Sequence, residues 1–364
     1  MWGFLTTITS LEFKGGKAFK PEEEHYLCMH WTVKRIFQAV FTVYVVVTLS
    51  FALIRLMPGG PMDYLRATLL GPDQTGTVDR ERLNRQIELY MNINPDQPLW
   101  EQYVQYMSSV FTGDFGQSIW FNRPVAEILL EALPWTVFVM GIALLLTFAI
   151  NIALGAIMAY KEGSRFDISM TFLSIISTSI PFYVGAILFL LFFSFTWELF
   201  PPGSRVNARL DPWTFEWIMS VLHHATLPIL SSVLIGLGSG ALIMRGNSIQ
   251  VLGKDYLRVG RLRGLPEGRL ALRYVGRNAV LPMYTSLMIA IGNVFGGAVV
   301  LEEIFTYPGV GYYLFVAVEA RDYMLLMGAF ILITVAVVVC LVVADLTYGL
   351  IDPRAKGGGY DEHA

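Results

Sequence analysis

Six long apolar runs constrain this chain more than any other feature. They cover residues 36–57, 135–159, 168–197, 225–244, 279–301 and 323–344. Each is long enough to cross a bilayer as a helix, which takes about 20 predominantly apolar residues. The last five contain no Asp, Glu, Lys or Arg, and the first contains only Arg55, near its end. Because a lone segment in lipid must satisfy its own backbone hydrogen bonds, the runs predict an all-α membrane protein with six transmembrane helices.

Charge is scarce and unevenly distributed. Charged residues make up 15% of the chain, against roughly 25% in soluble domains. With a cytoplasmic N-terminus, six spans place residues 161–167 and 245–278 on the inner side, and the second of these loops holds eight Lys and Arg. The short outer loops 198–222 and 302–322 hold three together. This bias follows the positive-inside rule and predicts that both termini are cytoplasmic.

This topology divides the chain into five segments. They are a cytoplasmic N-terminal extension (1–33), a first transmembrane helix (34–57), a long extracytoplasmic segment (58–134), a five-helix core with the loop 245–278 (135–351) and a cytoplasmic tail (352–364). We expect the extension to be disordered or to lie on the membrane surface. In the extracytoplasmic segment, apolar residues at helical spacing predict helices over 77–90 and 98–110. A segment of this length is expected to dock something external.

The sequence lacks the motifs of ATP chemistry and of metal sites. GGK at 15–17 and GK at 253–254 lack the upstream glycine and the following Ser or Thr of a phosphate-binding loop. Cys28 and Cys340 have no partner at metal-ligand or redox spacing. Ionisable residues are almost absent from the apolar runs, although ion-coupled carriers usually need them. We therefore predict no enzyme activity and no cofactor in this chain, and energy for any transport must enter from elsewhere.

Residues 255–282 form a basic stretch between two apolar runs. We predict a short helix over 255–263 that Gly264 ends, since glycine adopts the left-handed cap conformation without steric cost. A capped helix projecting from a membrane can fill a groove in a soluble partner, with its arginines at the rim. Alternatively, the arginines only enforce topology and bind anionic lipid headgroups. The residues alone leave both interpretations open.

Two further patterns lie inside the spans. Pro181 interrupts the third run and predicts a kink, with Ser and Thr at 174–179 available to bond freed carbonyl groups. The kink is either a packing feature or the wall of a polar translocation path. Glycines four residues apart, at 236 and 240 and at 292 and 296, favour close helix packing over a direct role with a solute.

The basic loop resembles the signature of ABC importer permeases, at Arg258-Val259-Gly260, Gly264 and Leu281-Pro282. Val259 stands where the pattern usually has a small residue. The long gap between Gly264 and Pro282 is similar to the oligopeptide/dipeptide/nickel importer family, and the order of pieces is closest to its first-permease type. The matching pieces include LIRLMPGGP at 53–61, GDFGQS at 113–118, SIPFYVGAIL at 179–188, RGNSIQVLGKDYLR at 245–258, GGAVVLEEIFTYPGVG at 296–311 and LIDPR at 350–354. The resemblance runs from about residue 30 to 356, and residues 1–29 exceed the usual pattern.

The resemblance implies a type I ABC importer permease fold and a set of partners. These are a second homologous permease, two ABC ATPase subunits that bind ATP and Mg, an extracytoplasmic substrate-binding protein and the lipid bilayer, with no nucleic acid. The expected location is the cell membrane of a bacterium or archaeon. The expected solute is peptide-like or oligosaccharide-like, as for relatives of this type. The sequence does not identify it further, because selection rests largely on the binding protein.

The same resemblance suggests three groups of site residues. The ATPase-coupling group is Asp255, Tyr256, Arg258, Arg261, Gly264 and Leu265. The translocation-pathway group is Ser177, Ser179, Asn293 and Phe295. The group for docking of the binding protein is Asp114, Phe115, Gln117, Glu302, Glu303 and Tyr307. The competing functions are a stand-alone secondary carrier or channel, which would need a midplane ionisable site or an inverted repeat, and a membrane scaffold without transport activity.

Overall fold

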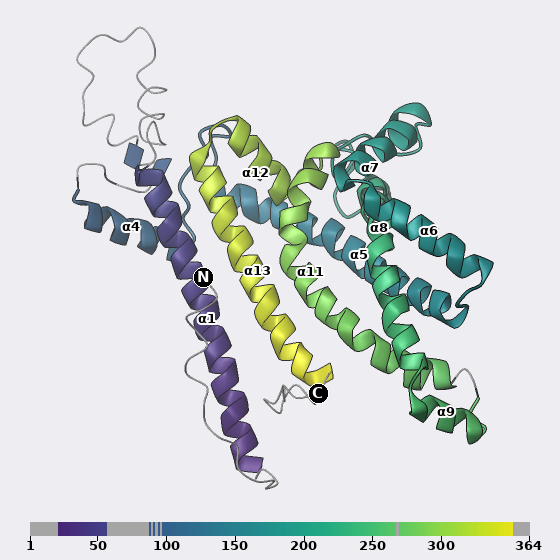
Figure 1. Ribbon diagram of the computed structural model, residues 1–364. Helices are drawn as coiled ribbons and strands as arrows, with labels where there is room; N and C mark the ends of the chain where they lie inside the picture. Colours follow the sequence, from purple (N-terminus) through teal and green to yellow (C-terminus); the bar gives the residue numbers. More distant parts are fainter. Residues whose placement is uncertain are drawn as a thin grey trace, which may run out of the picture.

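The computed structural model describes residues 21–56, 87–88, 90–91, 94, 97–266 and 269–351. This part of the chain is helical and contains no β-strand, in agreement with the predicted all-α class. One isolated antiparallel bridge pairs Gln117 with Pro124. Figure 1 shows the long helices running side by side, with shorter helices gathered at their ends.

Five helices are long and the remaining segments are short. The long ones are α1 (Pro21–Leu56), α5 (Val125–Tyr160), α8 (Phe215–Leu252), α11 (Arg277–Ile304) and α13 (Tyr323–Ile351). The short ones are α4 (Leu99–Phe111), α6 (Arg165–Ser179), α7 (Phe182–Phe189), α9 (Asp255–Leu262) and α12 (Val310–Glu319), with π-helical segments η1 (Leu190–Thr196) and η2 (Leu270–Gly276).

Four helices of the described chain are long and apolar enough to cross a membrane. They are Val33–Leu53 within α1, α5, α8 and Tyr323–Ala344 within α13. The bent pair of α6 with α7–η1 makes a fifth if it is counted as one span. The remaining predicted span, residues 279–301, lies within α11, which is not among these candidates. The multi-pass membrane class is therefore supported, while six spans stay a prediction.

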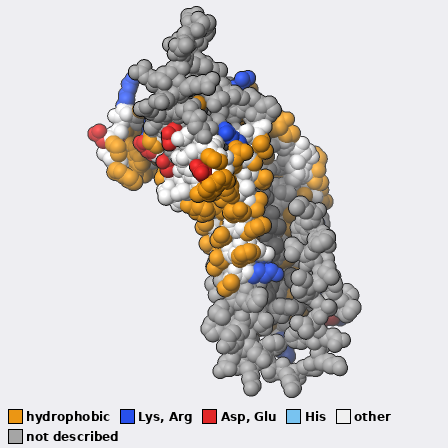
Figure 2. All heavy atoms as spheres, turned by 90° about the vertical axis from the view of Figure 1, so that its left-hand side faces the viewer, with side chains coloured by type: hydrophobic (Ala, Val, Ile, Leu, Met, Phe, Trp, Pro, Cys, Tyr) orange, Lys and Arg blue, Asp and Glu red, His pale blue; other side chains and the backbone are white. Residues whose placement is uncertain are grey.

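The helices alternate in direction, so their connections gather at two ends. Figure 1 shows α9 at the same end as the start of α1, the end of α13 and the turn between α5 and α6. The helices α4, α7 and α12 lie toward the opposite end. We call these the α9 end and the α12 end. Figure 2 shows hydrophobic side chains gathered on the face of α1 and α4, with acidic side chains near α4.

Helix α8 lies against both α5 and α6, and glycines set how closely it approaches them. A Cβ on Gly236 would lie 3.1 Å from Cγ2 of Thr147 in α5, and a Cβ on Gly240 would collide with the Asn151 side chain. The predicted close packing at these two glycines is confirmed. Gly238, which the spacing did not single out, faces α6, where a Cβ would collide with the backbone oxygen of Ser174.

The predicted kink at Pro181 is a complete break. Helix α6 ends before Ile180, whose backbone is extended at φ −86° and ψ 120°, and α7 starts after Pro181, with a bend of 99° between the two limbs. A residue before proline is driven out of the α region by the proline ring, which explains the extended Ile180. Thr178 and Ser179 donate hydrogen bonds to the Ile175 oxygen at 2.9 and 2.8 Å. These hydroxyls bond backbone carbonyls near the break, as predicted.

Two expectations at the N-terminal side have different outcomes. Helix α4 confirms the helix predicted over 98–110. Its Tyr103 packs edge-to-face and its Tyr106 packs at a tilt against Phe51 of α1, with ring centroids 5.3 and 5.6 Å away. The helix predicted over 77–90 falls almost wholly outside the described residues.

Helix α1 begins at Pro21, so residues 21–33, which were predicted as part of the N-terminal extension, belong to the same helix as the first span. Proline at the first helical position followed by acidic residues favours such a start.

Candidate functional site

Helix α9 is a short helix with a glycine cap, as the sequence predicted. Its last turns are closed by the N–H of Arg263 donating to the Val259 oxygen at 3.0 Å and the N–H of Leu265 donating to the Gly260 oxygen at 3.2 Å. Gly264 has φ +70°, in the left-handed region that other residues enter only with strain. The chain therefore leaves α9 in a fixed direction.

One side of α9 is anchored to the segment that follows it. Leu257 is buried and packs with Leu270 and Val275 of η2, and Leu265 packs against this cluster. A Cβ on Gly260 would come within 2.7 Å of Cδ2 of Leu270, so glycine permits this approach. The anchor fixes which residues of α9 point away from the bundle.

The other side of α9 is exposed at the α9 end. Of the predicted coupling residues, Asp255, Tyr256, Arg258, Arg261 and Gly264 are exposed, and Leu265 is partly buried. Leu262 is 82% exposed and Val259 is 45% exposed. These two apolar side chains were missed, although their spacing of three residues places them on one helical face. The result is an apolar tip between arginines, which suits a groove with a polar rim.

The predicted pathway residues lie in different surroundings. Ser177 donates hydrogen bonds to the backbone oxygens of Leu234 and Ile235 in α8, at 3.2 and 2.9 Å, so its hydroxyl joins two helices. Ser179 is exposed beside the break at Pro181 and bonds within α6. Phe295 is buried in α11. The side chain of Asn293 lies outside the described residues.

The predicted docking residues before α5 form a tight loop at the α12 end. Asp114 and Gln117 are exposed, whereas Phe115 is partly buried. The Asp114 carboxylate accepts the Gly116 N–H at 3.0 Å, and the Gln117 N–H donates to the Tyr90 oxygen at 3.0 Å. Gly116 has φ +80°, and a Cβ there would collide with the Tyr90 oxygen. The loop is thus closely fitted, with two polar side chains presented outward.

The predicted docking residues after α11 are mostly internal. The side chains of Glu302 and Tyr307 are fully buried, and Glu303 is partly buried. The Glu302 carboxylate accepts the Tyr312 N–H at 3.0 Å, which ties α11 to α12. Burial raises the pKa of the Tyr307 phenol above its ordinary value. Glu302 and Tyr307 thus shape the turn between α11 and α12, and their side chains are not on its surface.

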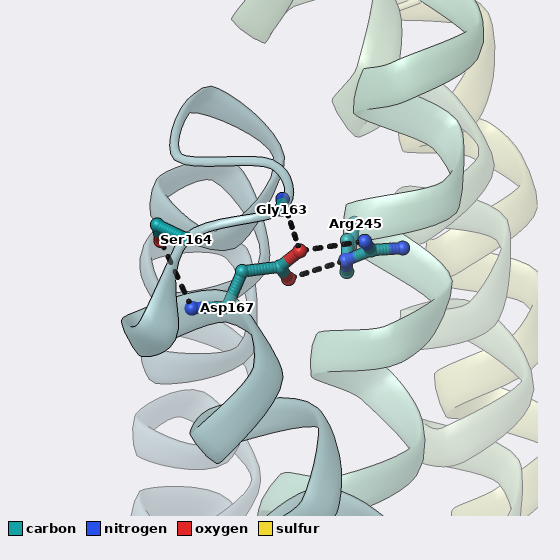
Figure 3. Close-up of polar contacts among 4 residues, drawn as sticks. All are labelled: Gly163, Ser164, Asp167 and Arg245. Carbon is teal, nitrogen blue, oxygen red and sulfur yellow. Dashed lines mark hydrogen bonds and ion pairs between the residues drawn. The ribbon is translucent and has the colours of Figure 1, made fainter.

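Two buried carboxylates form polar contacts that the sequence analysis did not find. Asp167 of α6 pairs with Arg245 of α8 at 2.6 Å near the α9 end, as Figure 3 shows. Asp322, before α13, accepts hydrogen bonds from the Ser118 hydroxyl and the Trp120 N–H near the α12 end. The available signal was a charge directly beside an apolar run, a position that solvation at the membrane surface explains equally well.

Comparison with known proteins supports the resemblance. Residues 151–357 match the family model described as binding-protein-dependent transport system inner membrane component. The chain is 32% identical over 348 residues to the probable D,D-dipeptide transport system permease protein DdpB of Escherichia coli, covering 90% of this chain and 99% of that protein. It is 30% identical over 327 residues to the oligopeptide transport system permease protein AppB of Bacillus subtilis, covering 90% and 99%. It is 30% identical over 330 residues to the dipeptide transport system permease protein DppB of Bacillus subtilis, covering 90% and 97%.

Proposed function

The chain belongs to the family of binding-protein-dependent transport system inner membrane components, and from that premise we propose that it forms half of the translocation pathway of an ATP-driven importer. The observation that carries the mechanism is α9, a capped helix with an exposed apolar tip at one end of a membrane-type helical bundle. A subunit that only anchors or conducts has no need of such a helix.

The proposed topology has six spans, of which α11 is one, and both termini in the cytoplasm. Two observations support it. The loop 245–278 carries eight Lys and Arg, which favours the cytoplasmic side. The start of α1, the end of α13 and α9 lie at the same end of the bundle (Figure 1). The boundaries at residues 34, 58, 135 and 352 then separate the extension, first helix, outer segment, core and tail.

In this proposal α9 docks on an ATPase subunit. Leu262 and Val259 enter a groove, and Arg258 and Arg261 pair with acidic groups at its rim. ATP and Mg are bound by two partner ATPases, so this chain performs no hydrolysis itself. A second homologous permease completes the pathway. ATP binding draws the ATPases together and moves α9, which turns the permeases from inward- to outward-facing.

The α12 end is the proposed docking surface for an extracytoplasmic binding protein. Asp114 and Gln117 are exposed there and provide the direct contacts. Glu302 and Tyr307 support the surface from beneath by holding the turn between α11 and α12. Along the pathway we keep Ser177, Ser179, Asn293 and Phe295 as proposed residues, with Ser179 nearest to the break at Pro181.

The proposed solute is a short peptide. The similar proteins DdpB, AppB and DppB are named for transport of D,D-dipeptides, oligopeptides and dipeptides. An oligosaccharide-like solute is the second candidate. The proposed location is the cell membrane of a bacterium or archaeon.

Affinity purification from the native host tests this function. The expected result is recovery of a second permease, two ATPases and a binding protein with the chain. Leu262→Asp should lose the ATPases, because a charge at the centre of the apolar tip cannot be desolvated without cost. Leu99→Asp is the matched control, since Leu99 is 57% exposed in α4, away from the α9 end, and that variant should keep them. Recovery of the wild-type chain alone would favour the stand-alone carrier or channel.

A further inference from the structure

Helices α6 and α8 are joined at three levels. Near the α9 end, Asp167 pairs with Arg245. Further along, the backbone of Ser174 touches Gly238 so closely that no Cβ fits between them. Nearest the break at Pro181, the Ser177 hydroxyl bonds the Ile235 oxygen at 2.9 Å. Contacts spread over most of α6 make the two helices a single body rather than two neighbours in loose contact.

The ion pair is the strongest and most directional of these contacts. Nε of Arg245 donates to Oδ1 of Asp167 at 2.6 Å, and Nη2 donates to Oδ2 at 2.7 Å (Figure 3). Two parallel hydrogen bonds fix both the distance and the orientation of the partners. The Asp167 side chain is 3% exposed, so water competes little for it. The N–H of Gly163 also donates to Oδ2, at 3.0 Å, which ties the turn before α6 to the same carboxylate.

Helix α5 supports α8 at the same level. A Cβ on Gly155 would lie 2.5 Å from the Ala241 oxygen, 2.6 Å from Cβ of Met244 and 2.9 Å from the backbone nitrogen of Arg245. The backbones of α5 and α8 are therefore in direct contact beside the ion pair. Helix α8 therefore cannot move closer to α5 at this level without a steric clash.

The connection from α8 to α9 is also rigid. Only Gly253 and Lys254 separate the two helices. Their N–H groups donate to the oxygens of Ile249 and Val251 at 3.2 and 3.1 Å, and the Leu257 N–H donates to the Lys254 oxygen at 3.1 Å. Buried apolar contacts of Leu257 with the last turn of α8 add to this. A force on α9 is thus delivered to α8 without a flexible linker.

We propose that Asp167 and Arg245 are positioning residues that make α6 move as one body with α9, so that displacement of α9 reaches the break at Pro181. This inference rests on the proposed function, in which an ATPase displaces α9. The Asp167–Arg245 pair then transmits movement from α9 to α6. This role is separate from its effect on the stability of the fold, which for a buried ion pair can have either sign. Energetic coupling between sites needs an element that both sites move, and the joined helices α6, α8 and α9 are that element.

A distance measurement between α6 and α9 tests the proposal. The importer is reconstituted in lipid vesicles with its partners, after Cys28 and Cys340 are replaced. Spin labels are placed by Lys254→Cys, at the residue directly before α9, and by Phe172→Cys in α6, since both side chains are exposed and neither lies in the proposed ATPase contact. The interlabel distance is measured without nucleotide and after addition of ATP with vanadate, which traps ADP in the ATPases after hydrolysis. ATP hydrolysis is measured on the same vesicles without vanadate.

Three variants separate transmission from simple stability. Asp167→Asn removes the charge but keeps an acceptor for the Gly163 N–H. Arg245→Lys keeps the charge and loses the two-bond geometry. Ser164→Ala is the matched control, because the Ser164 hydroxyl caps α6 by accepting the Asp167 N–H at 3.2 Å and takes no part in the ion pair.

In the wild-type importer we expect the same narrow distance in both nucleotide states, although the complex hydrolyses ATP. Asp167→Asn should broaden the distance and make it depend on ATP, with hydrolysis kept within about twofold. Arg245→Lys should give a distance distribution between those of the wild type and Asp167→Asn. Ser164→Ala should give the wild-type distribution. Two results would overturn the proposed role of the ion pair while the proposed function stands. One is a wild-type distance that changes with ATP, and the other is an Asp167→Asn distance identical to that of the wild type. Absence of ATP hydrolysis by the wild-type complex would overturn the proposed function, and with it the proposed role of the ion pair.

Discussion

The hydroxyl of Ser118 donates a hydrogen bond of 2.5 Å to the carboxylate of Asp322, across 204 positions of sequence. The same carboxylate oxygen accepts the Trp120 N–H at 3.1 Å. The other oxygen accepts the Leu325 N–H at 3.2 Å, in the first turn of α13. One buried side chain therefore caps α13 and holds the loop before α5 in place.

Asp322→Ala should destabilise the protein by about 1–3 kcal/mol, because it leaves a buried hydroxyl and two N–H groups without their acceptor. Thermal unfolding of the purified protein in detergent measures this effect. Ser118→Ala removes only one donor and should cost less. Equal unfolding temperatures for Asp322→Ala and the wild type would show that the carboxylate is not a structural centre of this loop.

Two glycines of α8 should respond to alanine in opposite directions. Gly238→Ala should destabilise by about 1–3 kcal/mol, because its Cβ would force α8 away from the Ser174 backbone of α6. Gly246→Ala should stabilise by up to about 1 kcal/mol, because no described atom lies within 4 Å of its Cβ and alanine favours the helix. The pair is compared by thermal unfolding under identical conditions. A loss of stability at Gly246 equal to that at Gly238 would contradict the packing described for these helices.

Gly264→Val should leave the protein inserted in the membrane but weaken binding of the ATPases. The position has φ +70°, which costs a β-branched residue at least about 1–2 kcal/mol, so the direction of the chain after α9 would change. Copurification of the ATPases from membranes with matched protein levels is the measurement. Gly264→Asn is the control, since asparagine enters this region more readily. Normal ATPase binding by Gly264→Val would show that the left-handed conformation at Gly264 is not needed for binding of the ATPases.

Reversing the charge of Arg258 and Arg261 distinguishes the two interpretations of the basic loop. Both side chains are exposed on α9. If they pair with an ATPase, Arg258→Glu with Arg261→Glu should reduce ATPase copurification, and more strongly at low salt, where charge repulsion is less screened. If they serve lipid contact or topology, copurification is unchanged and binding to vesicles with anionic lipid falls instead.

The features that depend on local chemistry were predictable from the sequence. Charge-free runs identified the long apolar helices, and the left-handed preference of glycine identified the end of α9 at Gly264. Proline chemistry identified the position of the break at Pro181. Its angle of 99° was not predictable, because a proline fixes where a helix stops and the surrounding packing decides where the next one goes.

The contacts between distant segments were not predictable in the same way. Asp167 and Arg245 are separated by 78 positions, and nothing in either local sequence names the other. Glu302 and Tyr307 were predicted as docking residues from the family resemblance, and yet their side chains are buried. A single sequence places polar residues outside the membrane, but it does not tell which of them fold back to close a turn.

The break at Pro181 also sets how deep α6 reaches. Fifteen residues at 1.5 Å each give a helix of about 22 Å, short of the roughly 30 Å of hydrocarbon in a bilayer. The next limb turns almost at a right angle. Helix α6 alone is therefore too short to cross the apolar layer, and this span is complete only together with the limb that follows Pro181.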